Sequence, residues 1–335
     1  MENSSKNPNP VLDPIVPVIV AQSLVTAVSV GLFEALSQGP AELRFVALQT
    51  GIEPRAAKLL LDVLSRNGYV KKSESAYELT EVSQMTLIKS SPMSFVNWIK
   101  FCRIQIEAAG HLTEAVERNT LVNLFEKMPN PEDRLTHQRA MAETAKPIAS
   151  WIADVVPIPA GATQMLDIGG SHGVYSAAVC KKHSSMHSDV LELPASIEPA
   201  SQVMEESGSG TFCSLICADI LEWQSSKQYD FVFLGNIIHH FTPGEVKSVL
   251  EKIYRFLVDG GTIAIWDIDP SENAEDPTSA AFSLFFFITS GTTCYGSDEI
   301  GKFLGSAGFS DYKRLQPPGA SSHTLHIARK KRLGN

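Results

Sequence analysis

Apolar runs that end in a polar residue recur through the C-terminal half of the chain and predict a parallel β-sheet. The first run, residues 162–168, contains Asp167, and a helical pattern follows at 174–183. Between them the chain turns through three glycines: Gly169, Gly170 and Gly173. A strand, a glycine-rich turn and a helix in this order open an α/β domain that binds a nucleotide-like ligand.

The spacing of these glycines argues against a dinucleotide. The pattern Gly-x-Gly-x-x-Gly would require a glycine at Ile168. The carboxylate of Asp167 would repel a pyrophosphate but attract an ammonium or a sulfonium group, and S-adenosylmethionine carries both. Because a glycine-rich turn can also be purely structural, the turn alone leaves both interpretations open.

Four more apolar runs predict the other strands of this sheet: residues 189–194, 212–219, 229–238 and 261–267. A polar residue falls at the end of each of the five runs: Asp167, Glu192, Asp219, His239 and Asp267. In open α/β sheets the ligand binds at the carboxyl ends of the strands. Glu192 is placed to accept hydrogen bonds from ribose hydroxyls, and Asp219 could accept one from an adenine amino group.

The C-terminal residues predict how the sheet ends. Ser297 is expected to cap a helix that stops near Gly308. Residues 311–315 and 323–328 flank a Pro-Pro-Gly turn and predict an antiparallel hairpin that closes the sheet. A nicotinamide dehydrogenase would more often continue with another strand–helix unit.

The N-terminal third carries a different pattern. Residues 15–33 form a run without formal charge, and this run is long enough to span a membrane. Polar residues interrupt this run, prolines stand at its start, and no positively charged segment precedes it. We therefore expect no membrane partner, and instead a helix that is buried against a second subunit.

Helical patterns at 41–50 and 55–67, followed by a polar hairpin at 71–80, are typical of a winged helix. A locally basic face could bind DNA, which would make the protein a winged-helix regulator; its residues are Arg55, Lys58, Arg66, Lys71 and Lys72. The alternative is a module that only pairs subunits. The acidity of the whole chain and the second domain favour that alternative.

A long helix is expected over 94–119, and after a break at 129–131 further helices lead to the prolines at 157 and 159. This pattern predicts three parts: a helical and winged-helix dimerisation domain at 1–128, linking helices at 129–160, and a ligand-binding domain at 161–335.

Composition narrows the partners and the compartment. The 335 residues include 37 acidic and 28 basic side chains, a net charge of −9, which argues against nucleic acid and anionic membranes. The five cysteines are scattered and form no Cys-x-x-Cys motif, so neither a disulfide framework nor zinc is indicated. No acid cluster has the spacing of a cation site, and we expect no metal. A reducing cytoplasm is the simplest inference.

The motifs together resemble a known family over nearly the whole chain. They are Leu166-Asp167-Ile168-Gly169-Gly170-x-x-Gly173, Val190-Leu191-Glu192-Leu193-Pro194, Ala218-Asp219-Ile220, Asn236-Ile237-Ile238-His239-His240-Phe241 and Leu257-x-x-Gly260-Gly261. The chain is similar to S-adenosylmethionine-dependent O-methyltransferases of the caffeic acid and acetylserotonin type, and their bacterial and fungal relatives. The resemblance implies a class I methyltransferase fold, which is an α/β Rossmann-like sheet, preceded in the chain by an N-terminal dimerisation domain. It also implies a homodimer.

The resemblance also implies a cofactor site for S-adenosylmethionine. The glycine-rich turn would hold its methionine part, the acid after the second strand its ribose, and the acid after the third strand its adenine. The residues assigned to the cofactor are Asp167, Gly169, Gly170, Gly173, Glu192, Leu193, Asp219, Ile220 and Asn236.

His239 corresponds to the general base of the family, and its pKa range suits the deprotonation of a phenol. Asp267 could orient its imidazole, whereas His240 is expected to point the other way. Cys294 falls where plant relatives have a second glutamate. Because of this departure, an alternative function stays open: the chain could bind the cofactor but perform hydroxylation, decarboxylation or a ring-forming rearrangement.

The acceptor is expected to be a small aromatic or polyketide-like metabolite of secondary metabolism, methylated on a hydroxyl. An aromatic-rich stretch at 282–288 favours a flat apolar acceptor, although at least half of its phenylalanines are expected in the core. The residues assigned to the acceptor are Met141, Phe282, Phe286 and Cys294.

Overall fold

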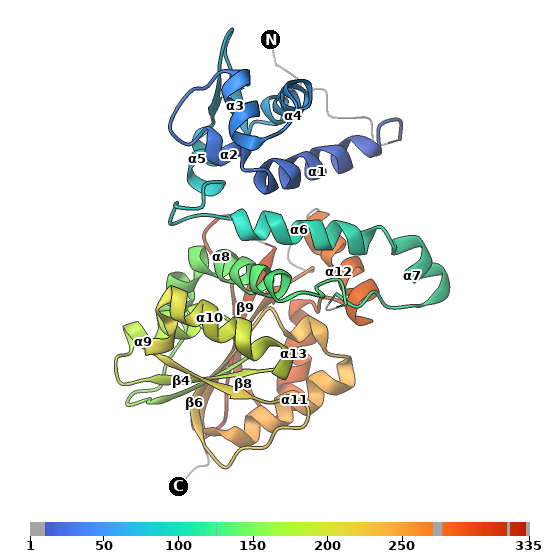
Figure 1. The fold of residues 1–335 in the computed structure, drawn as a ribbon. Coiled ribbons are helices and arrows are strands. Elements are labelled where there is room, and N and C mark those ends of the chain that lie inside the picture. Colours follow the sequence, from blue (N-terminus) through green and yellow to red (C-terminus); the bar gives the residue numbers. More distant parts are fainter. Residues whose placement is uncertain (1–10, 125, 271–276, 320–321, 333–335) are drawn as a thin grey trace, which may run out of the picture. The chain divides into compact units, whose positions relative to one another are not determined.

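The computed structural model describes residues 11–124, 126–270, 277–319 and 322–332. The chain divides into two units, residues 1–105 and 106–335, and each is described by itself (Figure 1). The domain limits expected from the sequence, at residues 128 and 160, stay a prediction.

The first unit contains the expected helices and hairpin. Its elements are α1 (Ile15–Ser29), α2 (Leu32–Ala35), α3 (Leu43–Thr50), α4 (Pro54–Arg66), β1 (Val70–Lys72), β2 (Tyr77–Leu79) and α5 (Glu81–Thr86). The helix expected over 15–33 is interrupted because Gly31 adopts a φ of +76°. On α1, Ile15, Val18 and Ile19 are exposed, so part of this uncharged helix is uncovered within the unit.

The helix expected over 94–119 is two helices, α6 (Val96–Ala109) and α7 (Leu112–Arg118), separated at Gly110. By contrast, the helices expected from residue 134 are one, α8 (Pro131–Val155), which Asn130 caps by accepting a hydrogen bond from the backbone of Asp133. In the first case Gly110 interrupts the apolar pattern. In the second case the break lies where it was expected, at 129–131, but the helix already begins at Pro131, a residue type that is favoured in a first helical turn.

The second unit is built on a seven-stranded sheet in the order β5-β4-β3-β6-β7-β9-β8. The strands are β3 (Gln164–Ile168), β4 (His187–Glu192), β5 (Cys213–Cys217), β6 (Tyr229–Gly235), β7 (Leu257–Ile268), β8 (Ser310–Leu315) and β9 (His323–Arg329). Strands β3 to β7 are parallel, and β9 pairs antiparallel with both β7 and β8. The expected closing hairpin is confirmed. The strand order reverses between β3 and β6, which is where such sheets bind ligands.

Helices cover both faces of this sheet: α8 with α9 (Val174–Lys182) and α10 (Ile197–Ser207) on one face, and α11 (Pro243–Phe256) with α13 (Ser297–Ser306) on the other. Helix α12 (Pro277–Ser290) instead contacts α7 and the 3-10 segment that follows β6. Along β6, Phe231 and Phe233 face α8 and α9, whereas Val232 and Leu234 face α11 and α13. This alternation follows from the two-residue period of a strand, and it gives the sheet a core on each side (Figure 1).

Two local expectations differ from the structure. The run 229–238 leaves the sheet after Gly235, because Asn236 has a φ of +53° and residues Ile238–His240 form a short 3-10 helix. Ser297 is the first residue of α13 rather than its cap, and its hydroxyl donates to the buried Asp269.

Replacing Ile253 tests the core on the α11 side of the sheet. Its side chain is fully buried, so Ile253→Ala should lower the free energy of unfolding by about 2–5 kcal/mol, measured by urea denaturation. Lys247→Ala, on the exposed side of the same helix, is the matched control and should change it by no more than about 0.5 kcal/mol. Equal effects of the two substitutions would contradict this packing.

Candidate functional site

A cavity of about 440 Å³ opens where the parallel strands end. Its wall combines strand-end residues with the α8 residues His137, Gln138 and Thr144. Seven of the residues assigned from the sequence line it: Met141, Gly169, Glu192, Leu193, Asp219, Ile220 and Asn236. The others lie behind the wall or beside it: Asp167, Gly170, Gly173, His239, Asp267, Phe282, Phe286 and Cys294.

The glycine-rich turn packs tightly against its surroundings. Gly169 has a φ of +66°, and a Cβ there would lie 2.1 Å from Cδ1 of Ile237. A Cβ on Gly170 would lie 2.3 Å from the carboxyl carbon of Asp167. Contacts this short exclude any larger side chain, so the backbone of the turn can approach a ligand closely.

Asp167 lies beneath this turn and is fully buried. Its Oδ2 accepts a hydrogen bond of 2.6 Å from Ser176, but no donor within the described residues reaches Oδ1. Burial and the charge of Glu192 raise the pKa of Asp167 to about 7. A buried carboxylate oxygen without a donor is costly, and an ammonium group held by the turn above it would stabilise its negative charge. These residues therefore fit the amino-acid part of S-adenosylmethionine.

Glu192 is the last residue of β4 and lines the cavity. Burial raises its pKa to about 7, although the backbone N–H groups of Leu193 and Ser171 oppose this by donating to the carboxylate. Glu192 and Asp167 thus place two closely spaced acids at the carboxyl ends of β4 and β3. A cationic ligand would relieve their mutual repulsion.

Asp219 lies in the turn that follows β5, where its Oδ1 accepts a 2.9 Å hydrogen bond from the backbone of Leu221. Lys252 of α11 supports this turn from behind. Its buried ammonium donates to the carbonyl oxygens of Ile220, at 3.0 Å, and of Leu221. Sequence reasoning missed Lys252 because a lysine on an amphipathic helix is ordinarily exposed.

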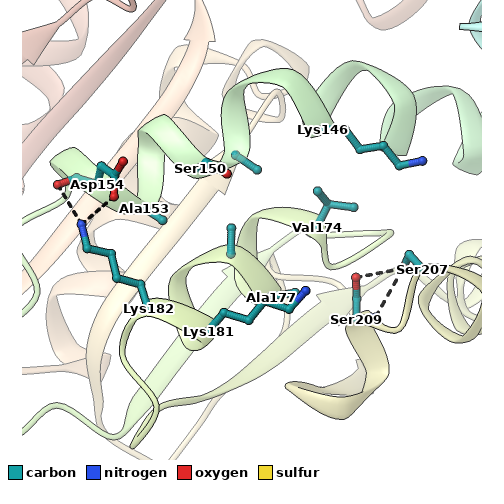
Figure 2. A pocket seen from close by; sticks show the side chains of 12 residues that line it. Lys146, Ser150, Ala153, Asp154, Val174, Ala177, Lys181, Lys182, Ser207 and Ser209 are labelled. Carbon is teal, nitrogen blue, oxygen red and sulfur yellow. Dashed lines mark hydrogen bonds and ion pairs between the residues drawn. The ribbon is translucent and has the colours of Figure 1, made fainter. Parts of the chain in front are cut away.

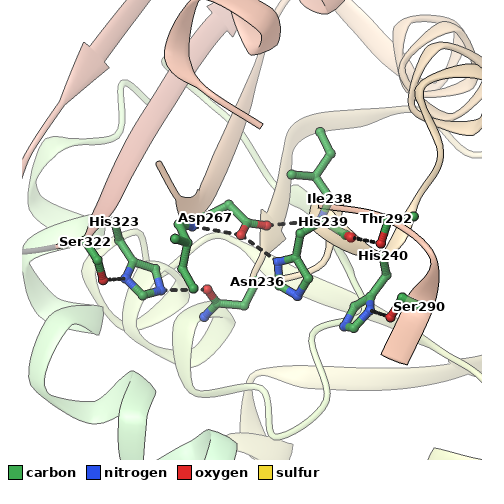
Figure 3. Close-up of polar contacts among 10 residues, drawn as sticks. Asn236, Ile238, His239, His240, Asp267, Ser290, Thr292, Ser322 and His323 are labelled. Carbon is green, nitrogen blue, oxygen red and sulfur yellow. Dashed lines mark hydrogen bonds and ion pairs between the residues drawn. The ribbon is translucent and has the colours of Figure 1, made fainter. Parts of the chain in front are cut away.

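His239 and Asp267 form a buried pair beside the cavity (Figure 3). The imidazole Nδ1 lies 2.6 Å from Oδ1 of Asp267. Backbone N–H groups of Ile238 and Ile268 donate to the same carboxylate at 3.1 and 2.8 Å. Burial alone would raise the pKa of Asp267, but the charge and hydrogen bond of His239 outweigh burial and lower it. The carboxylate therefore fixes Nδ1 as a donor and leaves Nε2 with the lone pair.

The expectation that His240 points away from the site is wrong. His240 lines the cavity, and its Nδ1 lies 3.0 Å from the hydroxyl of Ser290 (Figure 3). Its partial desolvation in the cavity wall and the neighbouring His239 lower its pKa, which favours the neutral ring near pH 7. The alternation of a strand does not apply here because the residues form a 3-10 turn.

A second histidine contact was not foreseen. Nε2 of His323, on β9, lies 2.9 Å from Oδ1 of Asn236 (Figure 3). The ring of His323 also stacks on Trp266 at 5.1 Å. This contact holds the side chain of Asn236, with its positive φ, at the cavity wall. No sequence signal links the two residues, because they are 87 positions apart.

The residues assigned to the acceptor occupy two places. Met141 lines the cavity, whereas Phe282, Phe286 and Cys294 pack together with Ile268. Burial raises the pKa of the Cys294 thiol to about 11, so it stays neutral near pH 7 and cannot replace a carboxylate.

A wider groove of about 580 Å³ runs between α8 and α9 (Figure 2). Lysines Lys146, Lys181 and Lys182 line it, and Lys182 pairs with Asp154 at 2.8 Å. Its lining includes none of the strand-end acids and none of the histidines described above. The smaller cavity is therefore the candidate site.

Two protein-family models match parts of this chain. Residues 116–310 match the family model of the O-methyltransferase domain, which covers more than half of the chain. The chain belongs to the O-methyltransferase family. S-adenosylmethionine is the cofactor of this family, and the predicted cofactor is confirmed. Residues 16–89 match the O-methyltransferase dimerisation domain, which indicates a homodimer.

Similar proteins act on several kinds of acceptor. A 3-hydroxy-5-methyl-1-naphthoate 3-O-methyltransferase of Streptomyces sahachiroi is 25% identical over 90% of this chain and 89% of that protein. An L-tyrosine C(3)-methyltransferase of Streptomyces lavendulae is 24% identical over 92% of this chain and 89% of that protein. The structure of human N-acetylserotonin methyltransferase with S-adenosylmethionine superposes with a TM-score of 0.84, at 22% identity, over 99% of this chain and 100% of that one. This likeness confirms the predicted class I methyltransferase fold.

Two features are absent from the residues that the structure describes. No helix among them is both long and apolar enough to cross a membrane. No three of their His, Cys, Asp or Glu side chains are grouped so that they could hold a metal ion.

The pKa values of Asp167 and Glu192 predict how cofactor binding depends on pH. The pKa of each carboxyl group is raised to about 7, so both groups become anionic as pH rises through 7. The same carboxyls have pKa values of 3.8 and 4.5 outside the fold, so the ligand-free protein loses stability as pH rises from about 4 to about 7. Above pH 7 both acids are anionic in the folded state, and the cationic cofactor should restore that stability. The increase in Tm caused by S-adenosylmethionine should therefore grow from pH 6 to pH 8, measured by differential scanning fluorimetry.

The matched variants are Glu192→Gln, which should flatten this pH dependence, and Glu205→Gln on the surface of α10, which should preserve it. A Tm increase that is independent of pH in the unsubstituted protein would show that these acids do not hold the cofactor.

Proposed function

We propose that this O-methyltransferase methylates a hydroxyl of a small, aromatic or polyketide-like metabolite, with His239 as the general base. The observation that carries the proposal is the buried contact of 2.6 Å between His239 and Asp267, beside a cavity lined by Glu192 and Asp219. A phenol has a pKa near 10, so its methylation near pH 7 requires a base.

The cofactor would lie along the strand ends. The turn at Gly169, Gly170 and Gly173, with Asp167 beneath it, would hold the amino-acid part. Glu192 and Leu193 would hold the ribose, and Asp219 and Ile220 the adenine, with Asn236 between this region and the base. When bound, S-adenosylmethionine supplies a methyl group activated by the adjacent sulfonium.

His239 would remove the proton of the acceptor. The hydrogen bond from Nδ1 to Asp267 leaves the lone pair of Nε2 available. As the acceptor hydroxyl approaches, its O–H bond breaks, the proton moves to Nε2, and the electron pair stays on the acceptor oxygen. The carboxylate of Asp267 stabilises the imidazolium that results, and two backbone N–H groups keep that carboxylate in position.

Two features support a flat, apolar acceptor. Met141 lines the cavity, and the α12 phenylalanines Phe282 and Phe286 pack beside the base. Relatives of similar sequence act on a naphthoate and in tetracenomycin polyketide synthesis, and both come from Streptomyces.

A second candidate is a reaction that uses the cofactor site without transferring a methyl group. One observation favours it: the neutral thiol of Cys294 stands where plant relatives have a second acid. Hydroxylation, decarboxylation and ring-forming rearrangement belong to this class. The mass of the product separates them from methylation, which adds one CH2 to the acceptor.

Substitution of the base is the direct test of its role. His239→Ala should lower kcat for methyl transfer by about 10²–10⁴-fold. Asp267→Asn should also lower it, because an amide has no charge to stabilise the imidazolium and can donate to Nδ1, which favours the wrong tautomer. Rates are measured by mass spectrometry of the methylated product, and binding of S-adenosylhomocysteine by calorimetry. Binding should stay within about threefold of the unsubstituted value.

His111→Ala, at an exposed histidine outside the cavity, is the matched control and should leave kcat unchanged. A His239→Ala enzyme with a near-normal rate would remove His239 from the mechanism.

A further inference from the structure

The ring of Phe286 lies flat on the imidazole of His239. The two ring centroids are 3.8 Å apart and the planes are inclined by 16°. The side chain of His239 is only 4% exposed, so one of its faces is covered by this aromatic ring rather than by solvent. Phe286 was expected to line the acceptor, but its closest aromatic partner in the structure is the base.

Neighbouring aromatic side chains hold Phe286 in place. Phe282 and Phe285, on the same helix, lie 5.9 and 6.2 Å from it between ring centroids. His240 meets it edge-on at 5.6 Å. Ile268 and Cys294 complete the cluster. With contacts on several sides, the ring keeps its face toward His239.

The charged and titratable groups around His239 come from three elements. Asp267 of β7 bonds to Nδ1, His240 follows in the chain, and His323 of β9 lies on the far side of Asp267 (Figure 3). Among these groups Asp267 is the one that carries negative charge. Cys294, which packs with Phe286, is a neutral thiol because burial raises its pKa to about 11. The imidazolium formed in the reaction therefore has one carboxylate and one aromatic face as partners.

The face of a benzene ring carries partial negative charge and attracts cations that lie over it. A neutral imidazole gains little from this face, whereas an imidazolium gains more, and the gain grows where water is excluded. The stacking of Phe286 therefore stabilises the protonated form of His239 selectively.

We infer that Phe286 is a positioning residue whose aromatic face stabilises the imidazolium of His239. The inference rests on the proposed role of His239 as the base. The step is the proton transfer given above: one O–H bond breaks, one N–H bond forms, and no electrons leave the acceptor.

Fluorinated phenylalanines test the inference because fluorine removes the negative character of the ring face with little change in size. Mono-, di- and trifluorophenylalanine are placed at position 286 of the full-length protein. The protonation of His239 is then followed by NMR with ¹⁵N-labelled histidine. The midpoint of that titration should fall with each fluorine, by about 0.4 to 1.5 pH units for the trifluoro ring. The acid limb of the pH–rate profile should move in the same direction.

The same fluorinated residues at Phe287, which is exposed on the same helix, are the matched control and should leave both midpoints unchanged. Phe286→Leu should lower the titration midpoint as the trifluoro ring does. A midpoint that ignores fluorination would overturn the inference, even if Phe286→Leu lowers Tm, because Phe286 would then be a packing residue only. The NMR readout does not depend on turnover, so a failure of His239 as the base is seen separately in the His239→Ala rates.

Discussion

The site depends on the parallel alignment of β3, β4, β5, β6 and β7. Parallel strands bring all their carboxyl ends to one edge, and here that edge receives Glu192, Asp219 and the segment that carries His239. The reversal of strand order between β3 and β6 opens the edge into a cavity. These residues are far apart in the sequence, and the sheet is what brings them together at the site.

This arrangement has an energetic cost. Asp167 and Glu192 are buried near one another, and burial raises the pKa of each to about 7. A carboxyl group whose pKa is higher in the folded state than in the unfolded state lowers the stability of the folded state once the pH exceeds the unfolded pKa. At the proposed site the cofactor would supply positive charge near these acids, which would couple its binding to the stability of the edge. The glycines of the turn allow that approach.

The proposed base has a different environment from the acids. His239 is shielded from water, fixed at Nδ1 by Asp267 and covered by Phe286, whereas His240 next to it faces the cavity. Consecutive histidines thus have separate surroundings, which the short 3-10 helix after β6 makes possible. Proton transfer is proposed for the buried ring of His239, whereas the ring of His240 lines the cavity.

Features that follow from a repeating pattern in the sequence could be predicted, whereas features that depend on long-range contacts could not. The five strands, the turn at Gly169 and the contact between His239 and Asp267 followed from periodicity, charge and family motifs. The orientation of His240 did not, because strand alternation was extended through a segment that leaves the sheet. The buried ammonium of Lys252 and the partner of Asn236 depend on tertiary packing that has no local signature.

The most direct test of the central claim is a crystal structure of the protein with S-adenosylhomocysteine. The account predicts the ribose hydroxyls within hydrogen-bonding distance of Glu192, the adenine beside Asp219, and the sulfur on the side of the cavity nearest His239. A ligand bound elsewhere, such as the groove between α8 and α9, with Glu192 and Asp219 untouched, would contradict it.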